Sequence, residues 1–246
     1  MKNKNKSLIY LLISLGILVI LNISCKKKDD NSPTYGRTNA VFNTGFTYGT
    51  VTDIDKNTYK TITIGTQTWM AENLRTTRYR NGEIIPEVTV HSAWIALTGG
   101  AYCNYNNTRN IDSIAIFGRL YNFYAASDSR NVAPTGWHVP SQTEWTTLIT
   151  YLGGSSVAGS KLKETFTIHW NSPSAGTNES GFTALPGGWR NALMKFFQMG
   201  KIGGWWSNTK DAVNTGFCET LYNSLSSVDS LSATFDNGFS IRCIKD

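Results

Sequence analysis

The sequence predicts an α+β domain built from short antiparallel strands, two or more helices and long loops. Segments with helical spacing of apolar side chains lie in the middle of the chain. Short apolar and aromatic runs, separated by Gly, Asn and Ser, lie at both ends. Strands and helices that alternated along the whole chain would instead indicate a parallel α/β sheet. This order of elements therefore favours antiparallel sheets with the helices segregated from them.

The first strands are predicted after Val51. Thr and Ile side chains recur through residues 59–64, Gly65-Thr66 is a turn signal, and residues 67–70 resume the strand pattern. We therefore expect a hairpin there. Further strands are expected toward the C-terminus, at residues 181–185, 203–207, 217–225 and 238–244.

Two helices are predicted between these groups of strands. Residues 117–126 place Leu120 and several aromatic side chains at helical spacing, which favours an amphipathic helix with an aromatic core face. A second helix is expected to begin after Ser141, because Ser141 and Glu144 have the spacing of a capping box. Gly153-Gly154 is expected to end this helix.

Residues 1–24 are typical of a secretory signal peptide. Three lysines precede an almost continuous apolar run from Leu8 to Leu21. This run of about fourteen residues is shorter than the twenty or so that a permanent transmembrane helix needs. Residues 21–25 resemble a lipobox, although Asn22 stands where leucine is usual. We therefore expect cleavage before Cys25 and lipidation of its thiol, which would anchor the protein on a membrane.

Residues 25–48 are predicted to form a lipidated, flexible tether. The Lys-Lys-Lys-Asp-Asp run at residues 26–30 resembles the export signals that send lipoproteins to the cell surface in one large group of Gram-negative bacteria. A plain solvated tether is the alternative. Residues 31–48 are rich in Asn, Thr, Ser and Gly without periodicity, which predicts a linker. The folded domain is then expected over residues 49–246, on an outer-membrane lipoprotein at the cell surface.

The formal charge of +6 does not indicate a nucleic-acid partner. Removal of residues 1–24 takes away three lysines and leaves +3, and the run at residues 26–30 holds one further net positive charge. The folded part is therefore nearly neutral and shows no basic stripe, which argues against nucleic-acid binding.

The cysteines and histidines predict no catalytic or metal centre. Cys103, Cys218 and Cys243 remain after lipidation, so one disulfide and one free thiol are expected in an oxidising compartment. Their spacing alone leaves three pairings open. The three histidines are not spaced as His-Glu-x-x-His, which would gather a metal ion. The sequence also lacks the Gly-x-Ser-x-Gly elbow of serine hydrolases.

Aromatic and polar side chains in the loop-rich C-terminal half form the predicted ligand-binding set. Tryptophan rings stack on sugars or anchor protein partners, and Asn and Arg side chains fix orientation by hydrogen bonds. Because adjacent strand residues point to opposite faces, at least one of the two neighbouring tryptophans is expected in the core. The set comprises Trp189, Arg190, Trp205, Trp206, Asn208 and Tyr222.

Several ordered motifs resemble those of one known family. They are Trp69-Met70-Ala71-Glu72-Asn73-Leu74, Gly136-Trp137-His138-Val139-Pro140 with Glu144-Trp145, Gly181-Phe182-Thr183-Ala184-Leu185-Pro186-Gly187-Gly188, Trp205-Trp206-Ser207 and Gly238-Phe239-Ser240-Ile241-Arg242-Cys243. From about Val51 to Asp246 the chain resembles the Fibrobacter succinogenes major paralogous domain, which is found in many surface lipoproteins.

The resemblance implies a fold and a disulfide. The family is similar to formylglycine-generating and sulfatase-modifying domains, whose fold is a variant of the C-type lectin, so a C-type-lectin-like domain is expected. It also implies a bridge between Cys103 and Cys243, which would leave Cys218 free. Many lectins of this fold hold a sugar through calcium, but the Glu-Pro-Asn and Gln-Pro-Asp tripeptides are absent. No cofactor is therefore expected, and residues 208–211 and 236–237 are only weak candidates for calcium ligands.

The favoured function is binding of a glycan or protein ligand, or display, at the cell surface. The first alternative is a redox or hydrolytic enzyme that resembles the sulfatase-modifying relatives. The redox form would require Cys218 and Cys243 to meet in a cleft. The second alternative is a structural envelope component without a small ligand. No catalytic residue and no metal ligand is predicted.

Overall fold

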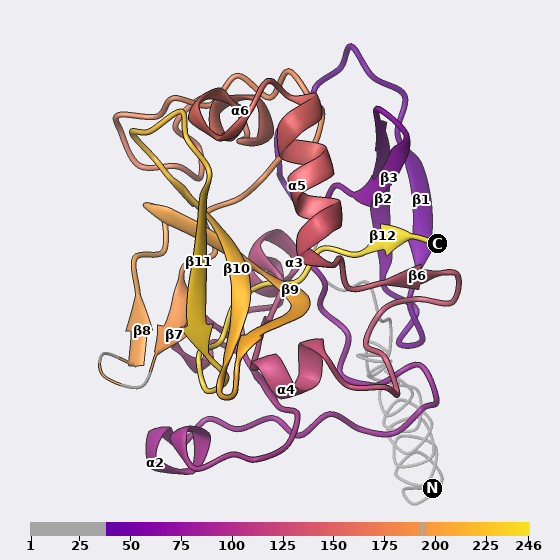
Figure 1. The fold of residues 1–246 in the computed structure, drawn as a ribbon, viewed down its shortest axis with the longest axis vertical. Helices are drawn as coiled ribbons and strands as arrows, with labels where there is room; N and C mark the ends of the chain where they lie inside the picture. Colours follow the sequence, from indigo (N-terminus) through magenta and orange to yellow (C-terminus); the bar gives the residue numbers. More distant parts are fainter. Residues whose placement is uncertain (1–37, 192, 194) are drawn as a thin grey trace, which may run out of the picture. The chain divides into compact units, whose positions relative to one another are not determined.

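The computed structural model describes residues 38–246 except Ala192 and Met194, so Cys25 and the predicted signal peptide lie outside the described residues. The described residues belong to one compact unit. This unit combines antiparallel sheets with short helices, which confirms the predicted α+β class (Figure 1).

A five-stranded antiparallel sheet contains strands from both ends of the unit. In spatial order its strands are β1 (Gly49–Thr52), β2 (Thr58–Ile64), β3 (Gln67–Met70), β12 (Ile244–Lys245) and β6 (Trp137–His138). The predicted hairpin is confirmed, because β2 and β3 pair across the turn at Gly65, where φ is 62°. Ile244 on β12 pairs with Trp69 on β3 and with His138 on β6. The C-terminal strand thus joins the N-terminal hairpin to the motif at residues 136–140.

A three-stranded sheet and two short ribbons complete the strand structure. The sheet has the order β11 (Asp229–Thr234), β10 (Thr215–Tyr222) and β9 (Ile202–Ala212), and the ribbons are β4 (Tyr102–Cys103) with β5 (Leu120–Tyr121) and β7 (Trp189–Asn191) with β8 (Lys195–Phe197). The strands predicted at residues 203–207 and 217–225 fall largely within β9 and β10. Residues 238–244 form isolated bridges and the start of β12.

The strand predicted at residues 181–185 does not form. Gly181 and Thr183 have φ values of 73° and 57°, and left-handed backbone cannot continue a strand. Ala184 makes a single bridge to Lys163. The segment is nonetheless buried, and its apolar side chains produced the strand-like pattern.

The capping box predicted at Ser141 is present. Helix α5 (Gln142–Tyr151) begins there, with Glu144 Oε2 accepting from the Ser141 backbone N at 2.7 Å and the Glu144 N donating to Ser141 Oγ at 3.3 Å. Gly153 and Gly154 end the helix with φ values of 102° and 94°. The other helical segments are α2 (His91–Ile95), η2 (Tyr105–Asn107), α3 (Ile111–Phe117), α4 (Phe123–Ala126) and α6 (Ser155–Leu162).

The helix predicted over residues 117–126 forms only in part, because α4 covers Phe123–Ala126 but residues 118–122 are not helical. Helix α3 ends at Gly118, where φ is 72° and an added Cβ would lie 2.6 Å from Asn73 Cβ. The chain then extends into β5, because Tyr121 pairs with Tyr102 and with Phe239. These long-range pairings override the helical spacing of the side chains.

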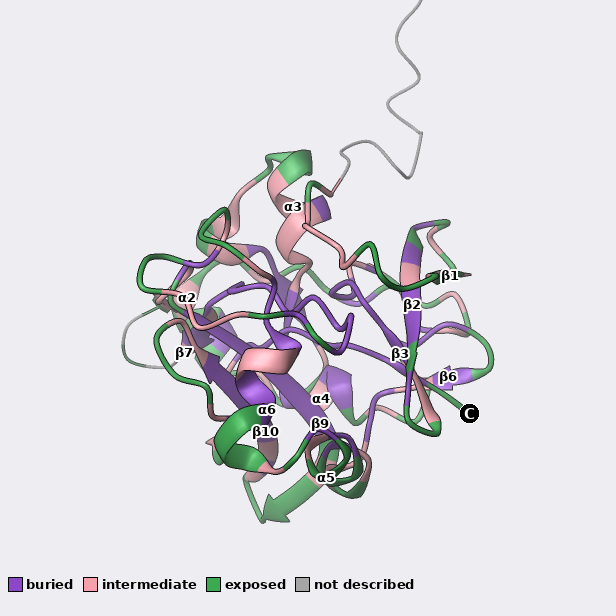
Figure 2. Ribbon diagram, turned by 90° about the horizontal axis from the view of Figure 1, so that it is seen from above, coloured by how far each residue is buried: buried purple, intermediate pink, exposed green. Residues whose placement is uncertain are grey.

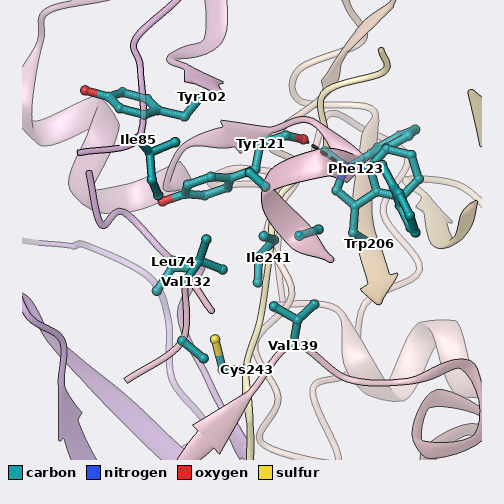
Figure 3. Close-up of a cluster of buried hydrophobic side chains, with 14 of the residues drawn as sticks. Leu74, Ile85, Tyr102, Tyr121, Phe123, Val132, Val139, Trp206, Ile241 and Cys243 are labelled. Atoms are coloured by element: carbon teal, nitrogen blue, oxygen red, sulfur yellow. Dashed lines mark hydrogen bonds between the residues drawn. The ribbon is translucent and has the colours of Figure 1, made fainter. Parts of the chain in front are cut away.

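The core consists of two large clusters on opposite faces of β9, which is buried over residues 202–207 (Figure 2). Trp205 packs with Trp69 and Trp145 in one cluster. Trp206 packs in the other cluster, and Figure 3 shows it beside Phe123 with a hydrogen bond to Tyr121. Trp205 and Trp206 thus point to opposite faces of β9, as expected for neighbouring strand residues, and both are buried in the core.

The last part of the predicted tether lies on the domain. The backbone N of Val41 donates to the buried carboxylate of Glu164 at 2.6 Å, and Asn178 Nδ2 donates to the carbonyl of Val41 at 3.3 Å. The hydroxyl of Tyr48 donates to the Gly181 carbonyl at 2.9 Å. Residues 41–48 are therefore held to the domain by specific contacts that the composition of this segment did not predict.

Candidate functional site

Three of the six predicted ligand contacts are core side chains. Trp205, Trp206 and Arg190 are 1%, 0% and 0% exposed. The indole N–H of Trp205 donates to Asn73 Oδ1 at 2.9 Å, and the Arg190 guanidinium lies 4.3 Å from the ring centroid of Trp94. This burial corrects the prediction, because each of these polar groups is used inside the domain.

The other three predicted contacts do not converge on one surface. Trp189 is half-buried, with its ring 5.0 Å from that of Phe197. Tyr222 pairs with Ile202 at the start of β9, whereas Asn208 lies six residues further along this strand. Six residues of strand span about 20 Å. Asn208 and Tyr222 therefore cannot contact the same small ligand.

The disulfide expected between Cys103 and Cys243 is not formed, because all three described cysteines are free and buried. Cys103 packs with Trp94 and Leu120, whereas Cys243 belongs to the cluster around Trp206. Burial raises the pKa of the Cys103 thiol to about 11 and that of Cys218 to about 12. Burial also raises the pKa of Cys243. Protonated, buried thiols are poor nucleophiles.

His138 bridges two carboxylates beside a small cavity. Its Nδ1 lies 2.6 Å from Asp246 Oδ1, and its Nε2 lies 2.8 Å from Glu144 Oε1. Burial alone would lower the pKa of His138, but hydrogen bonds and charge interactions with both carboxylates outweigh it and raise that pKa. The pKa of Glu144 is lowered, because the Ser141 and His138 contacts outweigh its burial. This arrangement joins β6, α5 and the C-terminus.

The cavity beside His138 has a volume of about 70 Å³. Its lining includes Asp128, Asn131 and Asn208. The Asp128 carboxylate is already held by Arg130, with Nε and Nη2 at 2.9 and 2.7 Å. Asn208 Nδ2 donates to the Val139 carbonyl at 2.9 Å. This space is large enough for a few water molecules and too small for a sugar ring.

A second cavity, the Arg80 cavity, has a volume of about 240 Å³. It is lined by residues of the 52–56 turn and of the 132–135 segment, together with Arg80. The guanidinium of Arg80 holds the second segment in place. Its Nε donates to the Ala133 carbonyl at 3.2 Å and its Nη2 to the Pro134 carbonyl at 2.8 Å, with a further bond from Nη2 to the Trp137 carbonyl.

The opposite wall of the Arg80 cavity is a turn built around Asp53. The Asp53 carboxylate accepts from the backbone N and Nδ2 of Asn57, each at 2.9 Å, and from the hydroxyl of Tyr59 at 2.6 Å. Burial raises the pKa of Asp53, although these hydrogen bonds oppose the effect. Lys56 lies in this turn with a φ of 68° and lines the cavity. Both walls are therefore held by side-chain hydrogen bonds, and the lining includes two cationic residues, Lys56 and Arg80.

The described residues contain neither a metal-binding cluster nor a membrane-spanning helix. Across residues 38–246, apart from positions 192 and 194, no group of three or more His, Cys, Asp and Glu side chains is arranged to hold a metal ion. Of the weak calcium candidates, Asp236 accepts a hydrogen bond from Thr234 Oγ1 within its own turn. None of the helices in this described part has the length and apolar character needed to cross a membrane.

These features define an α+β domain in which a cavity of mixed polar and apolar lining lies between the 52–56 turn and the 132–135 segment. The model of the Fibrobacter succinogenes major domain matches residues 62–245, and the chain belongs to this family. Comparison with curated proteins and with solved structures found no match.

The sequence did not single out Lys56, Arg80 or residues 132–135. Arg80 contacts carbonyls of residues 133, 134 and 137, which lie more than fifty positions away. No local pattern marks such a contact, because any arginine in a loop has the same appearance in sequence. The sequence offered only an indirect indication of this site. Residues 132–135 directly precede the family motif at residues 136–140.

Proposed function

We propose that this chain is an exported lipoprotein, anchored in the outer membrane through Cys25, whose domain binds a ligand at the cell surface. The signal-like residues 1–24, the lipobox-like residues before Cys25 and the charged run after it support the anchor. The Arg80 cavity supports the binding function and is the observation on which it rests.

The cavity is built as a binding site would be. Its walls come from distant parts of the chain. The 52–56 turn is held by hydrogen bonds to the Asp53 carboxylate, and the 132–135 segment is held by hydrogen bonds from the Arg80 guanidinium. A site that is rigid before binding loses little conformational entropy when the ligand enters. Ile54, Val132 and Pro134 add apolar surface next to the polar groups. Such a mixed lining is characteristic of small-molecule sites.

The volume of the cavity limits the ligand. About 240 Å³ is below the roughly 300–1,000 Å³ typical of drug-sized ligands. The site would therefore accept one sugar residue or a group of similar size. A longer glycan would enter through its terminal residue. A glycan end accordingly fits the cavity better than a folded protein surface does.

The fold we propose for the domain is a variant of the C-type lectin. In support, the N-terminal hairpin and the C-terminal strand β12 share one sheet, so the two ends of the domain lie together. The long chain between them forms the helices and the second sheet (Figure 1). This fold alone would not specify a ligand.

The test uses the mature chain with Cys25→Ser, which carries no lipid. Titration with sugars, with and without calcium, would be followed by backbone amide chemical shifts in NMR. We expect shifts confined to the 52–56 turn, the 132–135 segment and the amide of Arg80. Shifts elsewhere, or none at sugar concentrations of tens of millimolar, would overturn the proposed site and favour a structural role in the envelope.

A further inference from the structure

We propose that the ligand of the Arg80 cavity carries an oxyanion, which accepts hydrogen bonds from Nη1 of Arg80 and pairs with the ammonium group of Lys56. This inference rests on the binding function proposed above and specifies its chemistry.

Arg80 has donors that the protein does not use. The Ala133, Pro134 and Trp137 carbonyls engage its Nε and Nη2. Nη1 has no acceptor among the described residues, and it is not one of their buried unpaired atoms. Its two N–H groups are therefore accessible to solvent, on a residue that lines the cavity. A guanidinium that is already held by three carbonyls presents these two charged donors in a fixed direction, which favours an oxyanion as the acceptor.

Lys56 supplies a second positive charge at the same cavity. Its backbone is in the left-handed region at a φ of 68°, and its N–H donates to the Asp53 carbonyl at 3.1 Å within the turn. Left-handed backbone is uncommon for lysine, since Gly and Asn adopt it more readily. The turn itself therefore does not require a lysine, and its side chain is free to serve a ligand.

Asp53 is the only acid among the residues that line this cavity. Both of its carboxylate oxygens accept hydrogen bonds from Asn57 or Tyr59. No hydrogen bond or ion pair joins Asp53 to Arg80 among the described residues. With Lys56 and Arg80 counted against Asp53, the lining keeps an excess of positive charge. The hydroxyl groups of Thr52 and Thr135 can bind the neutral part of the same ligand.

The size of the cavity and its charge together point to an acidic sugar residue or to a free oxyanion. The two sources share one chemistry and are separated by the probes. We would titrate the mature Cys25→Ser chain with glucuronate, glucose and inorganic phosphate and follow the same amide shifts. Glucuronate is expected to bind and glucose to bind at least tenfold more weakly. Raising the salt from about 50 to 500 mM should weaken glucuronate binding, because salt screens exposed charges.

Lys56→Asn is the main variant, because asparagine tolerates the left-handed backbone and removes the charge. We expect glucuronate to bind about two- to fivefold more weakly, as for the loss of one exposed ion pair. Lys195→Asn is the matched control. Lys195 is also exposed and has a φ of 62°, but it lies on β8, far from the β1–β2 turn in Figure 1. This control should leave binding unchanged.

Arg80→Gln should weaken glucuronate binding at least tenfold, in line with loss of a hydrogen bond to a charged group. Because Arg80 also holds residues 133–137, the result for Arg80→Gln is used only if this variant keeps a native-like melting temperature. The test with Lys56→Asn does not depend on this variant. Tighter binding of glucuronate than of phosphate assigns the site to acidic sugars, and the reverse assigns it to a free oxyanion. Either order supports the inference.

Two results would overturn the inference. Equal binding of glucose and glucuronate in the cavity would refute the oxyanion while leaving the proposed binding function intact. Glucuronate binding that is unaffected by Lys56→Asn would refute the assigned contact. If no probe shifted any cavity residue, both the inference and the proposed binding function would fail.

Discussion

Replacement of Trp206 by phenylalanine tests whether this side chain belongs to the core or to a binding surface. Trp206 is fully buried, its indole N–H donates to the Tyr121 carbonyl at 2.8 Å, and its ring lies 4.8 Å from that of Phe239. Loss of the hydrogen bond removes about 1 kcal/mol. The smaller ring leaves a void that costs roughly a further 1–2 kcal/mol. We therefore expect Trp206→Phe to lower the free energy of unfolding by about 2–3 kcal/mol.

The assay is thermal and urea unfolding of the mature Cys25→Ser chain. For a domain of about 200 residues, a loss of about 2–3 kcal/mol lowers the melting temperature by roughly 4–12 °C. Trp206→Ala would cost about 3–5 kcal/mol for the ring alone, a large part of the total stability, so the phenylalanine variant is more informative.

Trp189→Phe is the matched control. Trp189 is half-buried against Phe197, and its indole N–H has no acceptor among the described residues. The same change there should cost less than about 1 kcal/mol. A Trp206→Phe chain with wild-type stability and reduced ligand binding would refute the core assignment.

Three further predictions concern the anchor, the thiols and pH. Replacing Cys25 by Ser in the full chain should release the protein from the membrane fraction, and undiminished membrane retention would refute the lipid anchor. Denatured mature domain should react with an alkylating reagent at three cysteines without prior reduction. Alkylation that requires a reductant would reveal a disulfide. The raised pKa of His138 stabilises the fold below the ordinary value of 6.5 and ceases to do so as pH rises through the raised value. The lowered pKa of Glu144 stabilises the fold above 4.5 and ceases to do so as pH falls through the lowered value. His138→Gln should therefore lower the free energy of unfolding most at pH values between the lowered pKa of Glu144 and the raised pKa of His138. An equal loss at about pH 5.5 and 8.5, measured by urea unfolding, would contradict this linkage.

The elements that sequence predicted well depend on neighbouring residues. The capping box at Ser141 needs only the next three residues, and the glycines after α5 supply the positive φ values that end it. The β2–β3 hairpin likewise depends on one alternating run and one turn. Such signals are complete within about ten residues, so no information from the rest of the chain is required.

The predictions that failed depend on distant residues. Residues 117–126 have helical spacing, but Tyr121 is paired with Tyr102 and with Phe239 near the C-terminus. The expected tether likewise has a polar composition, yet the backbone N–H of Val41 finds an acceptor in Glu164. In both places a long-range contact supplied free energy that local composition does not reveal.

Prediction of the site residues was likewise limited because it depends on long-range contacts. Tryptophan, arginine and asparagine were reasonable candidates by chemical type, but the same groups also satisfy one another inside a core. Arg190 and Trp205 do so, whereas Arg80 keeps unpaired donors at a cavity. Residue type alone cannot separate these cases, because the difference lies in which acceptors the fold brings within reach.

From the sequence alone, the α+β class, the capped helix α5, the β2–β3 hairpin and the family could be determined, because each depends on local periodicity or on motifs in a fixed order. Only the tertiary structure decided which polar and aromatic side chains are buried, that the thiols are free, and that Arg80 and Lys56 line the same cavity. Burial and pairing of side chains depend on contacts between residues far apart in the chain, and these contacts exist only once the sheets and helices have packed together.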